Sequence, residues 1–305
     1  MENPGNLAGP PANEAVTRGI SPEKWTVRES LKYVWDISSS KDGRGCGRWM
    51  SFSVARFCQA LGGKKLLVTG DSLNGQLALS LLLRLKIDQD VILDPGFSTK
   101  CIAARLAYPH LPVICFSSPI CESSGHPSQL YFIRSDYLDI PVAIPGFSSE
   151  NHWWVDEIAA QGVDMVVLNR GAHYVEDAAF EAQLNATFHH LRNRFPGLLL
   201  IVRSSAAGHA DCMNYSRPIE KRLPEEGLPH NWGEISHQNR IAERLAHSIG
   251  AAFLDVDEMT ALRPDSHMGR KGNSPDAVDC LHYCIPGPQD GWSDMLLNML
   301  LDLLP

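Results

Sequence analysis

Residues 65–85 constrain the fold most strongly, because a short apolar run leads directly into Gly-Asp-Ser and then a second apolar segment. The first run contains a β-branched pair and follows Gly62-Gly63, a pattern typical of a buried strand. The second segment has helical spacing, with Leu73, Leu77, Ser80, Leu81 and Leu85 on one face. Ser72 is therefore predicted at a sharp turn from strand to helix.

This position suits a nucleophile, because the hydroxyl stands at the edge of the sheet and the first N–H groups of the helix are free to face its target. The alternative is that Asp71 or Ser72 simply caps the helix. The turn alone does not decide between these two interpretations.

A second segment, residues 279–287, reads Asp-Cys-Leu-His-Tyr-Cys-Ile-Pro-Gly. We expect it to be a loop before a last helix. His282 follows Asp279 by three residues, which suits a general base and the carboxylate that orients it. A single histidine is more often a surface residue or a satisfied core residue.

The two segments together resemble those of the SGNH/GDSL-type hydrolases, in particular the PC-esterase branch with the plant trichome birefringence-like polysaccharide O-acetyltransferases. Those proteins carry a Gly-Asp-Ser block near the start of the domain and an Asp-Cys-x-His-x-Cys-x-Pro-Gly block near its end. The matching residues here are 70–72 and 279–287, followed by Asp290 and Trp292. The resemblance extends over roughly residues 30–305.

The resemblance implies a catalytic triad of Ser72, His282 and Asp279. It also implies an oxyanion site made by the Ser72 N–H, Asn169 and Gly171, although an asparagine that holds a turn is an equal interpretation of Asn169. The family usually reads Asn-Thr-Gly-His where this chain reads Asn-Arg-Gly-Ala-His, which leaves the second donor open.

Two further segments match segments of the family. Arg203 and His209 match an Arg-Thr-x-Ser-Pro-x-His segment, and we expect them to contact substrate or support the site. His209 is also a rival to His282 as the base. Arg263, Asp265 and His267 match an Arg-x-Asp-x-His segment to which we assign no chemical role.

Alternation of strands and helices along the chain predicts a three-layer α/β sandwich, with a mostly parallel sheet between helices. This is also the SGNH-hydrolase-like fold that the resemblance implies. Residues 1–21 read as a disordered leader, and residues 22–305 as one catalytic domain. Residues 117–150 lack a helical period and are rich in Gly, Pro and Ser, so we expect an irregular insertion over the active edge.

Charge and hydropathy exclude two classes of partner. The formal net charge is -8, without a basic stripe, which argues against nucleic acid. No apolar run approaches a membrane span of about 20 residues. The resemblance implies the secretory pathway and the Golgi lumen, but residues 1–15 show no signal core, so a targeting segment would be missing or trimmed. The sequence leaves a cytoplasmic location open.

Eight cysteines are even in number, but this count is not diagnostic of disulfides in a chain of 305 residues. Cys101 and Cys115 lie in apolar surroundings typical of free core thiols. The resemblance implies disulfides Cys212–Cys280 and Cys46–Cys284, which would tie the His282 segment to the body. A zinc site of His209, Cys212, Cys280 and Cys284 is a weaker alternative, because its spacing is loose.

Trp153 and Trp154 are adjacent on a predicted helix, so we expect one indole to be exposed as a platform for a sugar. Together these features favour transfer of an acetyl group, through an acetyl-serine, to a hydroxyl of a cell-wall polysaccharide. The acetyl donor is a co-substrate, and no metal or other cofactor is expected. The alternatives are a carbohydrate acetylesterase with the same triad and a non-catalytic carbohydrate-binding protein on the same scaffold.

Overall fold

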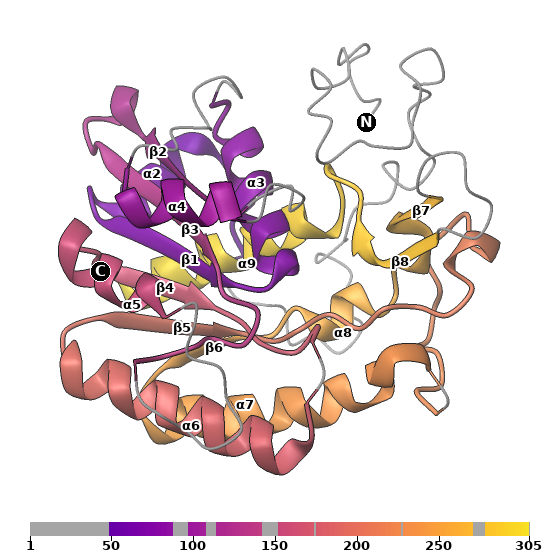
Figure 1. Ribbon diagram of the computed structural model, residues 1–305. Helices are drawn as coiled ribbons and strands as arrows, with labels where there is room; N and C mark the ends of the chain where they lie inside the picture. Colours follow the sequence, from indigo (N-terminus) through magenta and orange to yellow (C-terminus); the bar gives the residue numbers. More distant parts are fainter. Residues whose placement is uncertain are drawn as a thin grey trace.

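The computed structural model describes residues 49–87, 97–107, 114–141, 152–173, 175–226, 228–270 and 278–304. Within them, six strands form a central sheet in the order β2-β3-β1-β4-β5-β6 (Figure 1). These strands are β1 (Lys65–Gly70), β2 (Cys115–Ile120), β3 (Ser128–Arg134), β4 (Met165–Leu168), β5 (Leu199–Arg203) and β6 (Ala252–Leu254). All neighbours run parallel except β2, which is antiparallel to β3.

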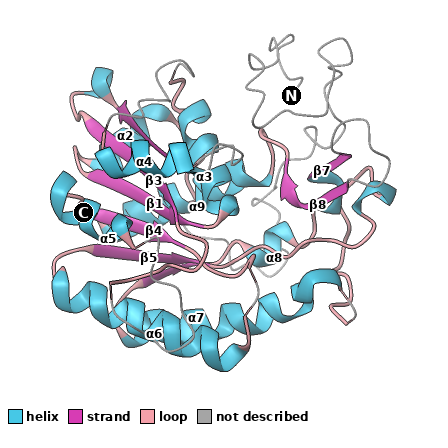
Figure 2. Ribbon diagram, in the orientation of Figure 1, coloured by secondary structure: helices cyan, strands magenta, loops and turns pink. Residues whose placement is uncertain are grey.

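Helices connect the strands and cover both faces of the sheet. The α-helices are α2 (Val54–Leu61), α3 (Ser72–Arg84), α4 (Thr99–Ala107), α5 (Trp153–Gln161), α6 (Asp177–Arg194), α7 (Ile235–Ser248), α8 (Asp257–Thr260) and α9 (Pro288–Leu303). Short 3-10 helices are η3 (Glu122–Ser124), η4 (Cys212–Asn214), η5 (Pro229–Glu234) and η6 (Pro264–Ser266). Two more strands, β7 (His267–Arg270) and β8 (Val278–Tyr283), form a small antiparallel sheet apart from the large one (Figure 2).

The alternation of side chains along β1 divides the core into two layers. Leu66 and Val68 pack on one face with α2, α3 and α9, whereas Leu67 packs on the other with α4, α5, α6 and α7. Successive residues of a strand point to opposite faces, so an all-apolar strand requires cover on both sides. Figure 1 shows α6 and α7 side by side along one of these faces. The predicted three-layer α/β sandwich is confirmed.

The predicted irregular insertion is wrong for residues 117–134. This segment contributes most of β2 and all of β3, and β3 lies next to β1 in the centre of the sheet. Pro119 and the polar residues of β2 and β3 mask the strand period in the sequence. The remaining residues of the supposed insertion, from 142 to 150, and the leader 1–21 lie outside the described residues.

Three disulfides join described cysteines: Cys58–Cys121, Cys101–Cys115 and Cys212–Cys280. The expectation of free thiols at Cys101 and Cys115 is therefore wrong, because apolar surroundings suit a buried disulfide as well as a thiol. Cys58–Cys121 links α2 to the end of β2. In the part of the chain that is described, no helix combines the length and apolarity needed to cross a membrane.

Removing the disulfides should destabilise the fold in proportion to the loops they close. The Cys58–Cys121 bridge spans 63 positions and the Cys101–Cys115 bridge spans 14. Chain entropy then predicts that replacing the first pair by alanine lowers the free energy of unfolding by about 4 kcal/mol, and the second by about 3 kcal/mol. Urea unfolding of the two double variants measures both values. A larger loss for the shorter loop would contradict this account.

Candidate active site

Ser72 is the first residue of α3 and follows directly from the end of β1. The chain turns there in very close contact with the end of β4. A Cβ built on Gly70 would lie 2.2 Å from Oδ1 of Asn169, so only glycine fits at this point. The turn therefore places the Ser72 side chain at the carboxyl edge of the sheet, as the sequence predicts.

The described chain brings Ser72, His282 and Asp279 together. Oγ of Ser72 lies 2.6 Å from Nε2 of His282, and Nδ1 of His282 lies 2.9 Å from Oδ2 of Asp279. The carboxylate accepts a hydrogen bond from Nδ1–H, which leaves Nε2 free to accept the serine proton. The His282 side chain is 27% exposed and that of Asp279 is 5% exposed, so the hydrogen-bonded chain runs from the surface inward.

The segment of Asp279 and His282 is not the loop that the sequence suggests, but strand β8 with a bulge. Gly269 pairs with Asp279 and His267 with Tyr283, so β8 uses four steps where β7 uses two. The extra residues allow side chains three apart to meet. Oδ1 of Asp279 accepts the backbone N–H groups of Leu281 and His282 at 3.1 and 2.9 Å. One carboxylate thus shapes the bulge and orients the imidazole.

Helix α3 holds β8 beside the nucleophile through Gln76. Its Nε2 donates to the carbonyl oxygen of Tyr283 at 2.6 Å, and its Oε1 accepts the N–H of Tyr283 at 3.2 Å. Gln76 is one helical turn after Ser72, and Tyr283 follows His282 directly. These two hydrogen bonds fix the register between the nucleophile and the base. The Cys212–Cys280 disulfide, the pair that the family resemblance implies, holds the same strand from the other side.

Asp71 caps α3 and connects three segments of the site. Its buried carboxylate accepts the N–H of Leu73 at 2.9 Å, Nδ2 of Asn169 at 2.9 Å and the N–H of Ala172 at 3.2 Å. Nδ2 of Asn169 also donates to Oγ of Ser205 at 3.3 Å. Both N–H bonds of the amide are thus directed at protein groups, which is the turn-holding interpretation of Asn169.

Arg203 and His209, expected to contact substrate, are buried. Arg203 is 1% exposed, and its Nε donates to Oδ1 of Asn74 on α3 at 2.6 Å. Burial lowers the pKa of Arg203 to about 10, and the charges of Asp71 and Asp257 oppose that change, so the guanidinium is charged at neutral pH. It lies over the ring of Trp292. Substrate contact by Arg203 is therefore wrong, because the residue lies beneath the nucleophile helix.

The expected indole platform is also wrong. Trp153 is 9% exposed and Trp154 is fully buried, with Nε1 of Trp154 donating to the carbonyl of Asp139 at 2.7 Å. Both rings are covered because the start of α5 is enclosed by neighbouring core residues rather than lying with one side in solvent. Helical position alone does not reveal such cover.

The zinc alternative is contradicted, because Cys212 and Cys280 share a disulfide and have no thiolates to offer a metal. His209 is turned elsewhere, toward His267 and the carbonyl of Ala261. Cys46 lies outside the described residues, so its bond with Cys284 stays a prediction.

An exposed group beside the active edge was missed in the sequence. Tyr137 is 38% exposed, and its ring lies 5.8 Å from that of His173. Nε2 of His173 is 3.3 Å from Oδ2 of Asp136, which is also paired with Arg134. These residues follow β3 and β4, the two neighbours of β1. The signal available was their position just after buried strands, but residues 134–137 were hidden in the supposed insertion.

Comparison with known proteins agrees with this geometry. The chain matches PC-Esterase, the GDSL/SGNH-like acyl-esterase family found in Pmr5 and Cas1p, over residues 147–299, half of its length. The chain belongs to this family. The match includes Asn169 and the segment of Asp279 and His282, whereas Ser72 precedes it.

Similar curated proteins come from plants. Protein trichome birefringence-like 20 of Arabidopsis thaliana is 33% identical over 155 residues, covering 44% of this chain and 31% of that protein. Xyloglucan O-acetyltransferase 1 of Arabidopsis thaliana is 34% identical over 96 residues, covering 28% and 22%. Xylan O-acetyltransferase 2 of Oryza sativa subsp. japonica is 22% identical, covering 100% and 74%. The chain thus spans less than a third of the first two relatives.

Solved structures with a similar arrangement include two enzymes. One is LAE5, an alpha/beta hydrolase from the metagenome of Lake Arreo, with 13% identity, coverage of 80% of this chain and 97% of that chain, and a TM-score of 0.43. The other is Axe2, an acetylxylan esterase from Geobacillus stearothermophilus, with 13% identity, coverage of 78% and 94%, and a TM-score of 0.42.

Replacing Gln76 tests whether α3 positions the base. Gln76→Leu leaves the Tyr283 backbone groups unpaired, at a cost of about 2–4 kcal/mol in the free energy of unfolding. Because the register of His282 is also lost, turnover of p-nitrophenyl acetate should fall at least tenfold at a temperature where the variant is folded. Gln238→Leu is the matched control, since Gln238 is equally buried but bonds Val175 and Asp177. Equal turnover in the two folded variants would contradict the positioning role.

Proposed function

We propose that the protein is an O-acetyltransferase that moves an acetyl group, through an acetyl-serine, to a hydroxyl of a plant-type cell-wall polysaccharide. The observation that supports this most directly is the continuous chain from Oγ of Ser72 through His282 to Asp279. The names of the relatives, xylan and xyloglucan O-acetyltransferases, support the substrate class.

The geometry supports two successive acyl transfers. Oγ of Ser72 attacks the carbonyl carbon of an acetyl donor while its proton passes to Nε2 of His282, and the donor's leaving group departs with that proton. A sugar hydroxyl then attacks the acetyl-serine. Its proton passes to Nε2 and from there to Oγ, which restores the serine. Asp279 stabilises the imidazolium in both halves.

The oxyanion of each tetrahedral intermediate requires donors aimed at it. The backbone N–H of Ser72, first in α3, fits this role, as does that of Gly171, which lies against Ser205 so closely that a Cβ would meet Oγ at 2.4 Å. The side chain of Asn169 could donate to the oxyanion only if Nδ2 gave up its hydrogen bond to Asp71 or to Ser205.

The acceptor sugar has a suitable contact surface in Tyr137, His173 and Asp136. The aromatic rings offer flat apolar faces for sugar C–H groups, and the carboxylate accepts hydroxyl hydrogens. This group is next to the nucleophile turn, since Ser135 N–H donates to Gly70 and Ala172 N–H to Asp71. An acceptor held there would outcompete water, because oriented groups reach effective molarities of about 10⁵ M or more. An esterase is the second candidate, because the same triad serves water.

The disulfides support a location in an oxidising compartment. Such bonds persist in the secretory pathway and are rare in the cytosol. The disulfides therefore support the proposal of a location in the secretory pathway, and analogy with the family supports the Golgi lumen.

The acetyl-serine is tested by substitution and by mass. Ser72→Ala should fold normally and lower turnover of p-nitrophenyl acetate by several orders of magnitude, because no acyl intermediate forms. His282→Ala should be similarly damaging, and His209→Ala milder. Intact-mass analysis after brief exposure to the donor should show one acetyl group on the wild type, at Ser72. Wild type with no turnover at all would instead favour a non-catalytic binding protein.

Transfer and hydrolysis are separated by following where the acetyl group goes. With a donor and xylan-type oligosaccharides, wild type should yield acetylated sugar at the expense of free acetate. Tyr137→Ala should raise the KM for the oligosaccharide about tenfold, much more than it changes kcat/KM for p-nitrophenyl acetate. Tyr215→Ala serves as a control at a tyrosine outside this surface. Acetate release that no oligosaccharide in a broad panel diverts would identify an esterase.

A further inference from the structure

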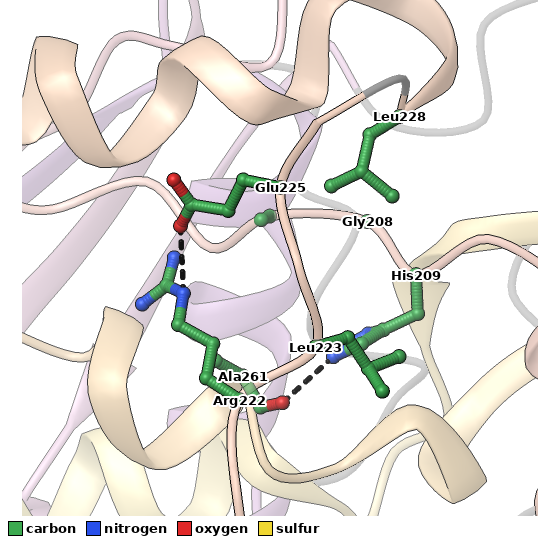
Figure 3. Close-up of a pocket in the computed structure, with 8 residues that line it drawn as sticks. Gly208, His209, Arg222, Leu223, Glu225, Leu228 and Ala261 are labelled. Carbon is green, nitrogen blue, oxygen red and sulfur yellow. Dashed lines mark hydrogen bonds and ion pairs between the residues drawn. The ribbon is translucent and has the colours of Figure 1, made fainter.

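Two histidines with no part in the acyl-transfer steps contact each other directly beneath β8. Nδ1 of His209 lies 2.7 Å from Nε2 of His267, and the exposed fractions of the two residues are 4% and 3%. The outer nitrogen of each ring faces a carbonyl oxygen. Nε2 of His209 is 2.9 Å from the oxygen of Ala261, and Nδ1 of His267 is 3.1 Å from the oxygen of His282. Figure 3 shows the contact of His209 with Ala261.

These three contacts require three protons. A carbonyl oxygen only accepts, so each outer nitrogen must carry a hydrogen. The inner nitrogens can form a hydrogen bond only if one of them also carries a hydrogen. Two neutral imidazoles have two hydrogens in total, so a neutral pair always places one lone pair against another. A single added proton satisfies all three of these contacts.

We propose that His209 and His267 form a positioning pair that shares one extra proton and holds the backbone of the catalytic base His282. The pair carries one positive charge and titrates as a unit rather than as two separate residues. It connects the segment after β5, through His267, to the carbonyl of His282 itself.

The surroundings act on this charge in both directions. Burial lowers the pKa of His267 to about 3 and lowers that of His209. Against burial stand the carboxylates of Asp265 and Asp279, both of which favour the charged form. The ring of Tyr283, stacked on His267 at 4.2 Å, adds a cation–π contact.

Among the described residues, the cations that act on the pair are Arg222 and, when protonated, His282. Arg222 has its own anionic partners, Glu225 at 2.7 Å (Figure 3) and Asp257 at 2.8 Å, which reduce its repulsion. The inner contact and the two carbonyl contacts are all hydrogen bonds at the same time only when the pair is protonated. We infer that these hydrogen bonds, with the two carboxylates, outweigh burial.

The shared proton has a consequence for catalysis. Only with the shared proton are the inner hydrogen bond and both carbonyl hydrogen bonds formed together. Because the backbone of His282 is held through its carbonyl oxygen, loss of the inner donor to His267 should loosen the position of the imidazole and lower kcat.

The proton is tested directly by NMR of the full chain with ¹⁵N-labelled histidine. At neutral pH, His209 and His267 should together show three N–H hydrogens, one of them coupled to both inner nitrogens. Two hydrogens in total, with a bare nitrogen facing Ala261 or His282, would overturn the proposal. This measurement needs no variant and no activity. It therefore tests the shared proton independently of the proposed acetyl transfer.

The effect on the base is tested with His209→Asn. Asparagine donates to His267 without a charge, so His267 keeps its contact with His282 in the neutral form. Folded His209→Asn should therefore keep kcat for p-nitrophenyl acetate within about twofold of wild type, whereas His209→Leu, which donates nothing to His267, should lower kcat about tenfold. His237→Leu, at an exposed histidine paired with Asp177, should leave kcat unchanged. Wild-type kcat in folded His209→Leu would overturn the positioning role.

Discussion

The active site depends on two hydrogen bonds between the Gln76 side chain and the backbone of Tyr283. Ser72 and His282 are 210 residues apart: Ser72 begins the helix that follows a strand of the large sheet, whereas His282 lies in the small sheet. Nothing in the strand order of the large sheet forces β8 to approach α3. The amide of Gln76 holds β8 against α3, because it pairs with the backbone of β8 as a neighbouring strand would. This places Nε2 of His282 at hydrogen-bonding distance from the nucleophile.

The polar groups beneath the nucleophile form a second support. Asp71 draws α3, Asn169 and the residue after Gly171 together, and the buried charge of Arg203 lies near that carboxylate and bonds Asn74. A buried cation is costly unless anions and hydrogen-bond acceptors surround it. Residues of the family segments that match here thus serve the geometry of the turn, whereas Tyr137 and His173 lie exposed at the same edge of the sheet.

Several residues that match family motifs are buried and support the fold rather than reach the surface. In the segment 263–267, Arg263 and Asp265 form a buried ion pair, and His267 joins His209 below the base. In the terminal block, Asp290 accepts from Ser80 on α3, while Trp292 donates to Thr260 and lies under Arg203. Burial distinguishes such supporting residues from those that reach substrate, and burial depends on which elements cover which.

The sequence by itself determined the strand–turn–helix at Ser72, the alternation of strands and helices that makes the α/β sandwich, and the pairing of Asp279 with His282. Periodicity, capping and short spacings act within a few residues, so they can be read locally. Tertiary structure alone decided that residues 117–134 complete the sheet, that Trp153, Trp154, Arg203 and His209 are buried, and that Cys101 bonds Cys115. Each of these outcomes depends on packing between elements whose neighbours are set by the order of strands in the sheet, and no local pattern carries that order.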